Sequence, residues 1–494
     1  MAARGLRCTR AAEAAELPDL PDLPERTVRA VVLAAGEGSR FGGRKLEARL
    51  AGRPLLQHVL DKLADAGLHD PIVVLPPDSG LEPLITWRDA QRVVNPDPGR
   101  GLSSSLQLGW AAALARDPPP VAVLVALGDQ PRMDPAVIGA LLDQPPDTSR
   151  PVVAPRFASS EARNPVRIDA SAAGTALVQA ATGDRGLGPL LDANPELVRW
   201  IDVAGDNPDV DARSDLVAAI EADWADRVLR NREQVERLRE TPDDADHYGP
   251  VTSLFRDDPR RTGDEILAAV LRHAQPGDTW LDVGAGAGRY AFPIALAVRE
   301  VIAVDPSAAM VAALHDGVRE HAIENVQVVH GRWPEAAASL APLPCADVSF
   351  IANVGHDTEL IGPFVDALDA AARRACIAVM QEQPPASMAA PFFETVHGER
   401  RTPLPALADF LDLLAARASS PRVEILERAA RTWRSREEVL TFLRRQTWVQ
   451  PGSEADTRLQ RALDADLRPA PGRAAGFHIG AAEPARIGVV RWSP

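Results

Sequence analysis

A glycine-rich segment with two cationic side chains follows the first apolar stretch of the chain. Residues 33–46 read LAAGEGSRFGGRKL. Glycines such as Gly36 and Gly38 let a backbone approach a polyphosphate closely, and their N–H groups can converge on its oxygens. Arg40 and Lys45 would add positive charge against a triphosphate. The spacing is not that of a Walker loop, so it indicates another kind of nucleotide site, with a basic surface loop as the alternative.

Two carboxylates could hold a metal ion near such a loop. Asp129 follows the apolar stretch 121–127, and Asp211 closes the acidic segment 209–211. Ligand sites in open parallel sheets lie at the carboxyl ends of strands. Magnesium is typically held by one or two carboxylates together with substrate phosphates. We therefore expect Asp129 and Asp211 to bind Mg²⁺, with a turn or capping role for Asp129 as the alternative.

Three serines stand where a helix is expected to begin. Ser103, Ser104 and Ser105 precede an apolar, alanine-rich segment. Their hydroxyls could cap the helix or contact a nucleotide. Capping is the expectation for at least two of the three, because serine oxygens accept hydrogen bonds from the free N–H groups of a first turn.

A second cluster of chemically active residues lies around residue 284. Gly284, Gly286 and Gly288 follow an apolar stretch that contains Asp282. A dinucleotide-binding Gly-x-Gly-x-x-Gly would need its third glycine where this chain has Arg289. The next apolar stretch ends at Asp305, where a carboxylate can accept hydrogen bonds from both hydroxyls of a ribose. The pattern therefore indicates a nucleoside cofactor other than a dinucleotide.

These residues must be positioned by alternating strands and helices. Such alternation predicts mostly parallel sheets covered by helices. A charged segment at about 215–240 lacks Gly and Pro and predicts a long helix. Ser435 and Glu438 predict a capping box at the start of another helix. The segments expected to be strands are 28–34, 71–75 and 121–127 in the first half, and 280–283, 300–304, 326–330, 348–351 and 375–381 in the second, with 477–481 and 486–492 as a final antiparallel pair.

Length and composition set the broad class. The 494 residues suit two domains rather than one core. With 46% hydrophobic and 25% charged residues, the chain has the balance of a soluble globular protein. The net charge of -15 argues against a nucleic-acid partner. The three cysteines have neither disulfide nor metal spacing, and no apolar stretch is long enough for a membrane helix. We therefore expect a cytoplasmic protein with small-molecule substrates.

The first half resembles the nucleotidyltransferases that build the molybdenum cofactor, in particular the cytidylyltransferase branch. Ala35 supports that branch, since the guanylyltransferases usually have a second glycine there. Residues 187–189 depart from the family, which often has an arginine in this region, and this weakens the inference about the acceptor. The resemblance spans residues 29–221 and rests on the segments 33–46, 52–56, 94–96, 101–106, 128–131, 164–166, 183–186 and 209–211.

This resemblance implies a Rossmann-like, GT-A-like domain that uses CTP and Mg²⁺. A phosphate of the acceptor, expected to be molybdopterin, attacks the α-phosphorus of CTP and releases pyrophosphate. Because a phosphate is already ionised, no general base is needed. Arg40 and Lys45 would then hold the triphosphate and Asp129 and Asp211 the metal. The residues implied to contact the nucleotide are Ala35, Gly36, Gly38, Ser103 and Ser104. Transient contact with proteins that mature molybdoenzymes is also implied.

The second half resembles class I S-adenosylmethionine-dependent methyltransferases. The match is tight over residues 279–381 and looser over 248–494. It implies a Rossmann-like domain with a terminal antiparallel hairpin, in which Asp282, Gly284, Gly286, Gly288 and Asp305 bind S-adenosylmethionine. Trp333 would pack on the adenine or belong to the core. Asn353 lies in a segment that faces the transferred methyl group. Candidate general bases are His356, Asp357 and Glu382, each with a structural role as the alternative, and His247 and Tyr248 could cover the cofactor.

Together the two resemblances predict a bifunctional enzyme of fold class α/β with two doubly wound domains. The expected organisation is a flexible tail over 1–27, a nucleotidyltransferase domain over 28–222, a helical connector over 223–250 and a methyltransferase domain over 251–494. Two alternatives stay open. The phosphate acceptor could be a sugar phosphate or another metabolite, and the second domain could bind S-adenosylmethionine without catalysing a reaction.

Overall fold

The computed structural model describes residues 27–36, 38–160, 162–184, 186–242, 246, 249–470, 476–480 and 484–494. These residues form two compact units. The first comprises the described residues up to Gly38, with Gly43–Glu47 and Leu55–Pro208. The second comprises Ser39–Gly42, Ala48–Pro54 and the described residues of Asp209–Pro494. Apart from Thr27, the expected tail lies outside the described residues.

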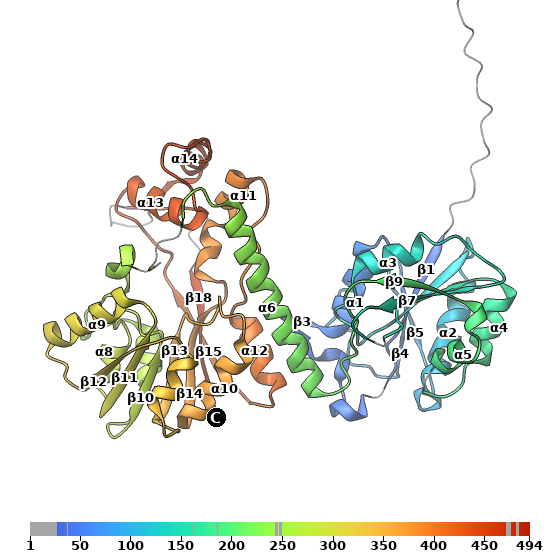
Figure 1. The fold of residues 1–494 in the computed structure, drawn as a ribbon, viewed down its shortest axis with the longest axis horizontal. Helices are drawn as coiled ribbons and strands as arrows, with labels where there is room; N and C mark the ends of the chain where they lie inside the picture. Colours follow the sequence, from blue (N-terminus) through green and yellow to red (C-terminus); the bar gives the residue numbers. More distant parts are fainter. Residues whose placement is uncertain are drawn as a thin grey trace, which may run out of the picture. The chain divides into compact units, whose positions relative to one another are not determined.

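The first unit is a seven-stranded sheet with helices on both faces (Figure 1). Its strands are β1 (Val28–Leu33), β4 (Ile72–Leu75), β5 (Gln91–Val94), β6 (Ala122–Leu127), β7 (Val152–Phe157), β8 (Val166–Asp169) and β9 (Val198–Val203). Its helices are α1 (Leu55–Asp65), α2 (Leu102–Leu114), α3 (Pro135–Leu142), α4 (Ala172–Ala180) and α5 (Gly188–Ala193). The strand order is β5-β4-β1-β6-β8-β7-β9, and β8 is antiparallel to both neighbours.

The side chains of β1 show how this unit is packed. Successive residues of a strand point to opposite faces. Ala30 and Val32 are buried in a core with α1 and α3, whereas Val31 and Leu33 are buried in a second core with α2 and α4. A strand buried on both faces needs a continuous apolar sequence, which is why 28–33 is apolar except for Arg29.

The second unit contains another seven-stranded sheet, in the order β12-β11-β10-β13-β14-β18-β15. Its strands are β10 (Thr279–Val283), β11 (Glu300–Asp305), β12 (Val326–His330), β13 (Ala346–Ala352), β14 (Ala372–Gln381), β15 (Arg422–Arg428) and β18 (Ala485–Trp492). Two small hairpins are formed by β2 (Arg49–Leu50) with β3 (Arg53–Pro54) and by β16 (Arg468–Pro469) with β17 (Phe477–His478). Strand β18 is antiparallel to both of its neighbours, β14 and β15, whereas the strands from β12 to β14 pair in parallel. The expectation of two doubly wound α/β domains is confirmed.

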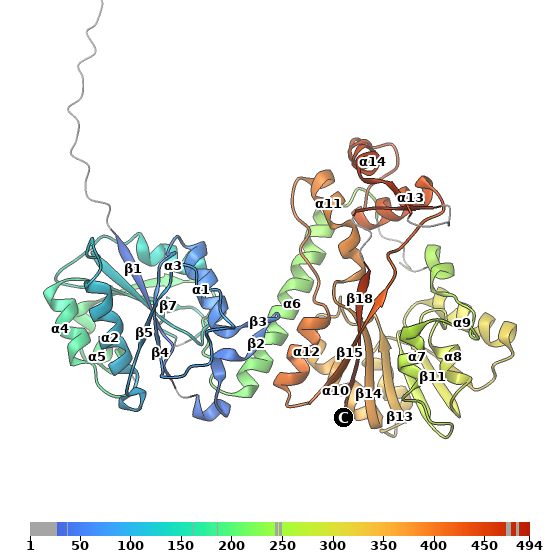
Figure 2. The ribbon, with the colours of Figure 1, turned by 180° about the vertical axis from the view of Figure 1, so that it is seen from behind.

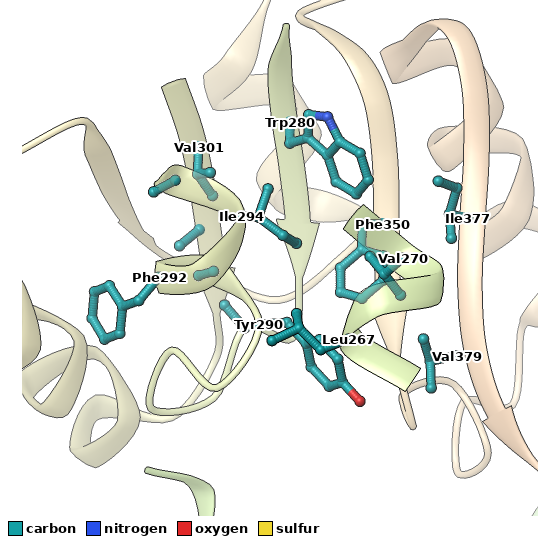
Figure 3. Close-up of a cluster of buried hydrophobic side chains, with 14 of the residues drawn as sticks. Leu267, Val270, Trp280, Tyr290, Phe292, Ile294, Val301, Phe350, Ile377 and Val379 are labelled. Carbon is teal, nitrogen blue, oxygen red and sulfur yellow. The ribbon is translucent and has the colours of Figure 1, made fainter. Parts of the chain in front are cut away.

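The core of this sheet lies beneath two helices, α7 (Glu265–Leu271) and α8 (Ala291–Ala295). Figure 3 shows Val270 of α7 beside Phe350 of β13, and Leu267 and Trp280 of β10 belong to the same buried cluster. Further helices of the unit are α6 (Arg213–Leu238), α9 (Ala308–His321), α10 (Ile361–Ala371), α11 (Ala390–His397), α12 (Leu407–Ala416), α13 (Arg436–Thr447) and α14 (Glu454–Asp466). The described helices include none with the length and apolar character needed to cross a membrane.

A separate helical group is inserted into the second unit. Helices α11, α13 and α14 share their own apolar core and lie together beyond the carboxyl ends of β14 and β15 (Figures 1 and 2). A terminal antiparallel hairpin is present, but its pairing differs from the expected one. Strand β17 pairs with β16, whereas β18 pairs with β14 and β15. The apolar run of β18 is buried between two strands, and this satisfies both of its edges.

Helix α6 crosses the expected boundary at residue 222 and runs on into the expected connector 223–250. It belongs to the second unit, where it packs on α10 and α12. Trp224 and Val228 are almost fully buried, and Trp224 Nε1 donates to the backbone oxygen of Thr358 at 3.0 Å. A helix with a buried apolar stripe is a packed element rather than a linker.

Candidate active sites

The carboxyl ends of β1 and β6 bring the predicted phosphate loop beside Asp129. The two strands are parallel neighbours at the point where the strand order reverses, which is the usual place for a ligand in an open sheet. Lys45 Nζ lies 2.6 Å from Asp129 Oδ2, and both side chains are mostly buried. Within the described residues, Asp129 Oδ1 is buried without a hydrogen-bond partner. That oxygen therefore fits a metal ligand.

The loop backbone leaves room for a ligand at its start. Ala35, the second residue after β1, is buried. A Cβ placed on Gly36 would have no atom within 4 Å, so its peptide groups can be approached closely. Gly38 has φ +60° and faces Lys45 Cβ. These features fit the predicted contact with phosphates.

The other predicted pair, Arg40 and Asp211, belongs to the second unit. Arg40 Nη2 lies 3.0 Å from Asp211 Oδ2, and the arginine side chain is 78% exposed. Asp129 belongs to the first unit. A shared metal ion at Asp129 and Asp211 therefore stays a prediction.

The three serines do not cap their helix as expected. The N-cap of α2 is Gly101, and it makes no side-chain capping bond. Gly101 has φ +91°, and a Cβ there would lie 2.5 Å from the carbonyl carbon of Gly183, so serine cannot occupy this position. Ser103, Ser104 and Ser105 lie in the first turn and are buried.

Asn95 is a site residue whose role the sequence did not reveal. Its Nδ2 donates to Ser104 Oγ and Ser105 Oγ, both at 2.9 Å. Ser104 Oγ in turn donates to the Gly101 oxygen at 2.8 Å. Asn95 lies in the segment 94–96 that carries the resemblance, and its hydrogen bonds to the serines arise because the end of β5 packs beside the start of α2.

In the second unit, Asp305 is held at the end of β11 by the glycine loop. Its Oδ2 accepts a hydrogen bond from Gly286 N at 2.8 Å, and its Oδ1 accepts one from Ser307 N at 2.9 Å. Burial raises the pKa of Asp305, while these two hydrogen bonds oppose the rise. Each oxygen keeps a further lone pair, so the carboxylate fits a ribose with two neighbouring hydroxyls.

Asp246 supports this arrangement and was missed by sequence reasoning. Its two oxygens accept from Ser307 Oγ at 2.8 Å, and one of them accepts from Ala309 N at 3.0 Å. It thereby fixes the start of α9 beside Asp305. Nothing in its local sequence distinguishes it from the neighbouring acidic residues.

Asp282 is buried in β10 behind the glycine loop. Its Oδ2 has no hydrogen-bond partner among the described residues. Burial, and then the charge of Asp305, raise the pKa of Asp282 to about 8. The carboxyl group is therefore mostly protonated at neutral pH and can donate a hydrogen bond to a ligand.

The glycines bring β10 and β13 close together. Gly284 has φ +72°, and a Cβ there would lie 2.5 Å from Val354 Cγ2. The predicted residue Asn353 precedes this valine, and its Oδ1 accepts from Gln381 Nε2 at 3.3 Å. Gly288 has φ +89° and leaves no room for a Cβ beside Phe292. The loop thus reaches the segment predicted to face the methyl group.

The surroundings of Trp333 favour a place in the core over packing on the adenine. It is 6% exposed, and its Nε1 donates to the Phe364 oxygen of α10 at 3.2 Å. A tryptophan that is buried and hydrogen-bonded within the fold behaves as core.

The candidate bases differ in their surroundings. His356 is buried in the loop after β13, Asp357 is exposed, and Glu382 forms an ion pair with Arg486 at 2.8 Å. His247 and Tyr248 lie outside the described residues.

Two stretches of the chain match known domain families. Residues 30–198 match the MobA-like NTP transferase domain, and residues 281–373 match the methyltransferase domain. A probable molybdenum cofactor guanylyltransferase of Thermococcus kodakarensis is 32% identical over 133 residues, which are 26% of this chain and 59% of that protein. A 2-C-methyl-D-erythritol 4-phosphate cytidylyltransferase of Aquifex aeolicus is 51% identical over 49 residues, 10% of this chain and 22% of that protein.

The chain thus spans less than two thirds of the length of either relative. Among solved structures, that of Rv0371c from Mycobacterium tuberculosis is 27% identical and covers 39% of this chain and 96% of its own, with a TM-score of 0.35.

Proposed function

We propose that this chain, which carries a MobA-like NTP transferase domain and a methyltransferase domain, is a bifunctional transferase. Its first activity is Mg²⁺-dependent transfer of a cytidylyl group from CTP to a phosphate acceptor. Its second is methyl transfer from S-adenosylmethionine to a small molecule. The Lys45–Asp129 pair at the ends of β1 and β6 is the observation that supports the first activity most directly.

The first reaction requires positioning more than proton transfer. An ionised phosphate of the acceptor attacks the α-phosphorus of CTP, and pyrophosphate leaves. Arg40 and Lys45 hold the triphosphate and neutralise the charge that builds on the leaving group. Asp129 and Asp211 would be the carboxylates that hold Mg²⁺, which would supply further charge neutralisation at the phosphate oxygens. Ser103 and Ser104, with Ala35, Gly36 and Gly38, line the nucleotide side.

Molybdopterin is the proposed acceptor, and the similarity to a probable molybdenum cofactor guanylyltransferase supports it. Ala35 supports CTP over GTP. A sugar phosphate or related metabolite is the second candidate, because the Aquifex aeolicus relative is a 2-C-methyl-D-erythritol 4-phosphate cytidylyltransferase. Residues 187–189, which depart from the molybdenum cofactor family, also favour this candidate.

For the second activity, Asp305 binds the ribose of S-adenosylmethionine and the loop from Gly284 to Gly288 binds its amino acid part. The orphaned Oδ2 of Asp282 and the two backbone bonds to Asp305 support this assignment. Asn353 faces the methyl group. The alternative is a module that binds S-adenosylmethionine without turnover. We also propose that the protein is cytoplasmic and acts on small molecules, without a nucleic-acid or membrane partner. It would make transient contact with molybdoenzyme maturation proteins.

Pyrophosphate release tests the first activity. The purified protein is incubated with Mg²⁺, molybdopterin and either CTP, GTP or ATP. We expect release with CTP alone, and Asp129→Asn should lower the rate at least ~100-fold because a carboxylate ligand of Mg²⁺ is lost. The exposed Asp143→Asn is the control and should keep the full rate. Full activity of Asp129→Asn would exclude its role as a metal ligand. Release when 2-C-methyl-D-erythritol 4-phosphate replaces molybdopterin, but not with molybdopterin itself, would favour the second acceptor.

Calorimetry with S-adenosylmethionine tests the second activity. Asp305→Asn should weaken binding by about 10- to 100-fold, because one hydrogen bond to a charged group contributes on the order of 1.5–3 kcal/mol. Asp316→Asn, on the exposed side of α9, should bind as the unaltered protein does. Unchanged affinity of Asp305→Asn would exclude its ribose role. Tight binding without any S-adenosylhomocysteine formation would favour the non-catalytic alternative.

A further inference from the structure

His356 follows a strand that lies beside the strand leading into the glycine loop. It belongs to the loop after β13, and β13 is the parallel neighbour of β10 on the far side from β11. The order of the sheet reverses between β10 and β13, so the crevice at their carboxyl ends is the expected ligand site. Val354, two residues before His356, packs on Gly284 of the cofactor loop.

A single hydrogen bond fixes the tautomer of this imidazole. His356 Nδ1 lies 2.8 Å from the backbone oxygen of Pro405. A carbonyl oxygen can only accept, so Nδ1 carries the proton and donates it. In the neutral ring Nε2 then holds a free lone pair. The side chain is 6% exposed, and Nε2 is buried without a hydrogen-bond partner among the described residues.

The surroundings keep the ring neutral. Burial lowers the pKa of His356, while the bond to Pro405 and the carboxylates Asp357 and Asp409 oppose that shift. Asp357 directly follows His356 in the same turn, and Asp409 comes from α12. Arg227 of α6 binds Asp409 through Nη1 at 2.6 Å, which compensates that carboxylate's charge. The result is a neutral imidazole with an unused lone pair.

Two other groups in this part of the unit, Glu382 and Tyr290, are less suited to accept a proton. Glu382 is engaged with Arg486 and is about half exposed. The hydroxyl of Tyr290 is buried without a partner in the described part of the chain, and Figure 3 shows it pointing away from the apolar cluster. Burial raises its pKa, so it is a hydrogen-bond donor at neutral pH and not a base.

We propose that His356 Nε2 is the general base of the methyl transfer and that the acceptor is a phenolic or enolic hydroxyl. This rests on the methyltransferase activity proposed above. The acceptor oxygen forms a bond to the methyl carbon while the bond from that carbon to sulfur breaks and leaves its electron pair on sulfur. The hydroxyl proton passes to Nε2 and gives an imidazolium, which later releases it to solvent. A hydroxyl needs this help because it is a poor nucleophile until it loses its proton.

Nitrogen NMR of the full chain with labelled histidine tests the placement without knowledge of the acceptor. S-adenosylmethionine carries a positive sulfonium, whereas S-adenosylhomocysteine carries a neutral sulfur. If Nε2 faces the methyl group, the titration midpoint of His356 should be lower in the first complex than in the second by about one pH unit. The signal is assigned with His356→Asn, whose side-chain amide can still donate to Pro405.

Equal midpoints in the two complexes, or a proton on Nε2 at neutral pH, would overturn the proposal. If neither compound binds the unaltered protein, the methyltransferase activity itself fails. A second measurement compares transfer of labelled methyl groups to catechol. His356→Asn should lower kcat at least ~100-fold and leave the affinity for S-adenosylmethionine unchanged. Equal kcat values, or a comparable loss of cofactor affinity, would overturn the role of a base.

Discussion

At the scale of the residue, Asp282 combines a ligand role with a cost in stability. Its pKa of about 8 in the folded protein lies far above its ordinary value. As the pH rises, Asp282 therefore loses its proton in the unfolded chain before it does so in the folded protein. Its contribution to the free energy of unfolding is fully present below about pH 4 and is lost progressively up to about pH 8. Asp282→Asn removes the ionisation and nearly keeps the shape. We expect the variant to be more stable than the unaltered protein above pH 8, by roughly 2–5 kcal/mol.

Urea unfolding from pH 4 to pH 9 measures this difference. The two proteins should converge towards pH 4 and diverge as the pH rises. Asp316→Asn is the control, because this half-exposed carboxylate should change the free energy of unfolding little at any pH. Parallel pH profiles for Asp282→Asn and the unaltered protein would show that Asp282 ionises normally in the fold.

Gly288 provides a second prediction at this scale. Its φ is +89°, and a Cβ there would lie 2.1 Å from Phe292 Cε2. Gly288→Ala should therefore lower the free energy of unfolding by more than about 2 kcal/mol. Gly263→Ala is the control for backbone strain alone, because Gly263 has φ +80° and a Cβ there would have no atom within 4 Å. This substitution should lower the free energy of unfolding by only about 1 kcal/mol. Equal losses in thermal unfolding would mean that the aromatic ring moves aside.

Individual residues could be predicted from sequence where their partners lie close by or at a strand end. Asp305 and Gly286 come from adjacent loops of one β-α-β unit, and the structure joins them. The bond from His356 to Pro405 spans two segments with no common motif, and so does the link from Asn95 to Ser105. Such partners depend on how elements pack, which no local pattern encodes.

At the scale of the element, strands with apolar runs were predictable and their order was not. The segments 280–283 and 300–304 are strands as expected, because buried parallel strands need a mostly apolar sequence. Strand β18 is also an apolar run, yet it pairs with β14 and β15 and not with the segment 477–481 that was expected to be its partner. Ser435 caps α13 as predicted, but Glu438 Oε2 accepts its hydrogen bond from Arg434 N rather than from Ser435 N.

Helix α6 carries a prediction about its packing. Arg227 is 16% exposed, and it binds Asp409 at 2.6 Å and the Leu404 oxygen at 3.1 Å. Arg227→Ala leaves a buried carboxylate without its partner and should cost about 3–5 kcal/mol. Arg230, on the exposed side of the same helix, also pairs with an aspartate, so Arg230→Ala should change stability by less than about 1 kcal/mol. Similar losses in urea unfolding would contradict the packed role of Arg227.

At the scale of the whole molecule, composition could indicate two units but not where they divide. A charged helix between two domains looks like a connector when its sequence is read alone. Its buried positions, among them Leu216, Ile220 and Trp224, are spaced at three to four residues. They form an apolar stripe whose partners, α10 and α12, come from distant parts of the sequence. The division observed at Pro208 therefore differs from the expected one at 222.

Two shortened proteins test this division. A chain of residues 209–494 retains α6, whereas a chain of 251–494 begins at the domain boundary expected from the sequence. Each large apolar side chain buried by α6 contributes roughly 1.5–3 kcal/mol. Both chains lack Gly52, which donates to Asp412 at 2.6 Å, so this loss is common to them. We expect the longer chain to unfold cooperatively in urea and the shorter one to be unfolded or aggregated. An equal free energy of unfolding would instead make α6 a connector that the methyltransferase fold does not require.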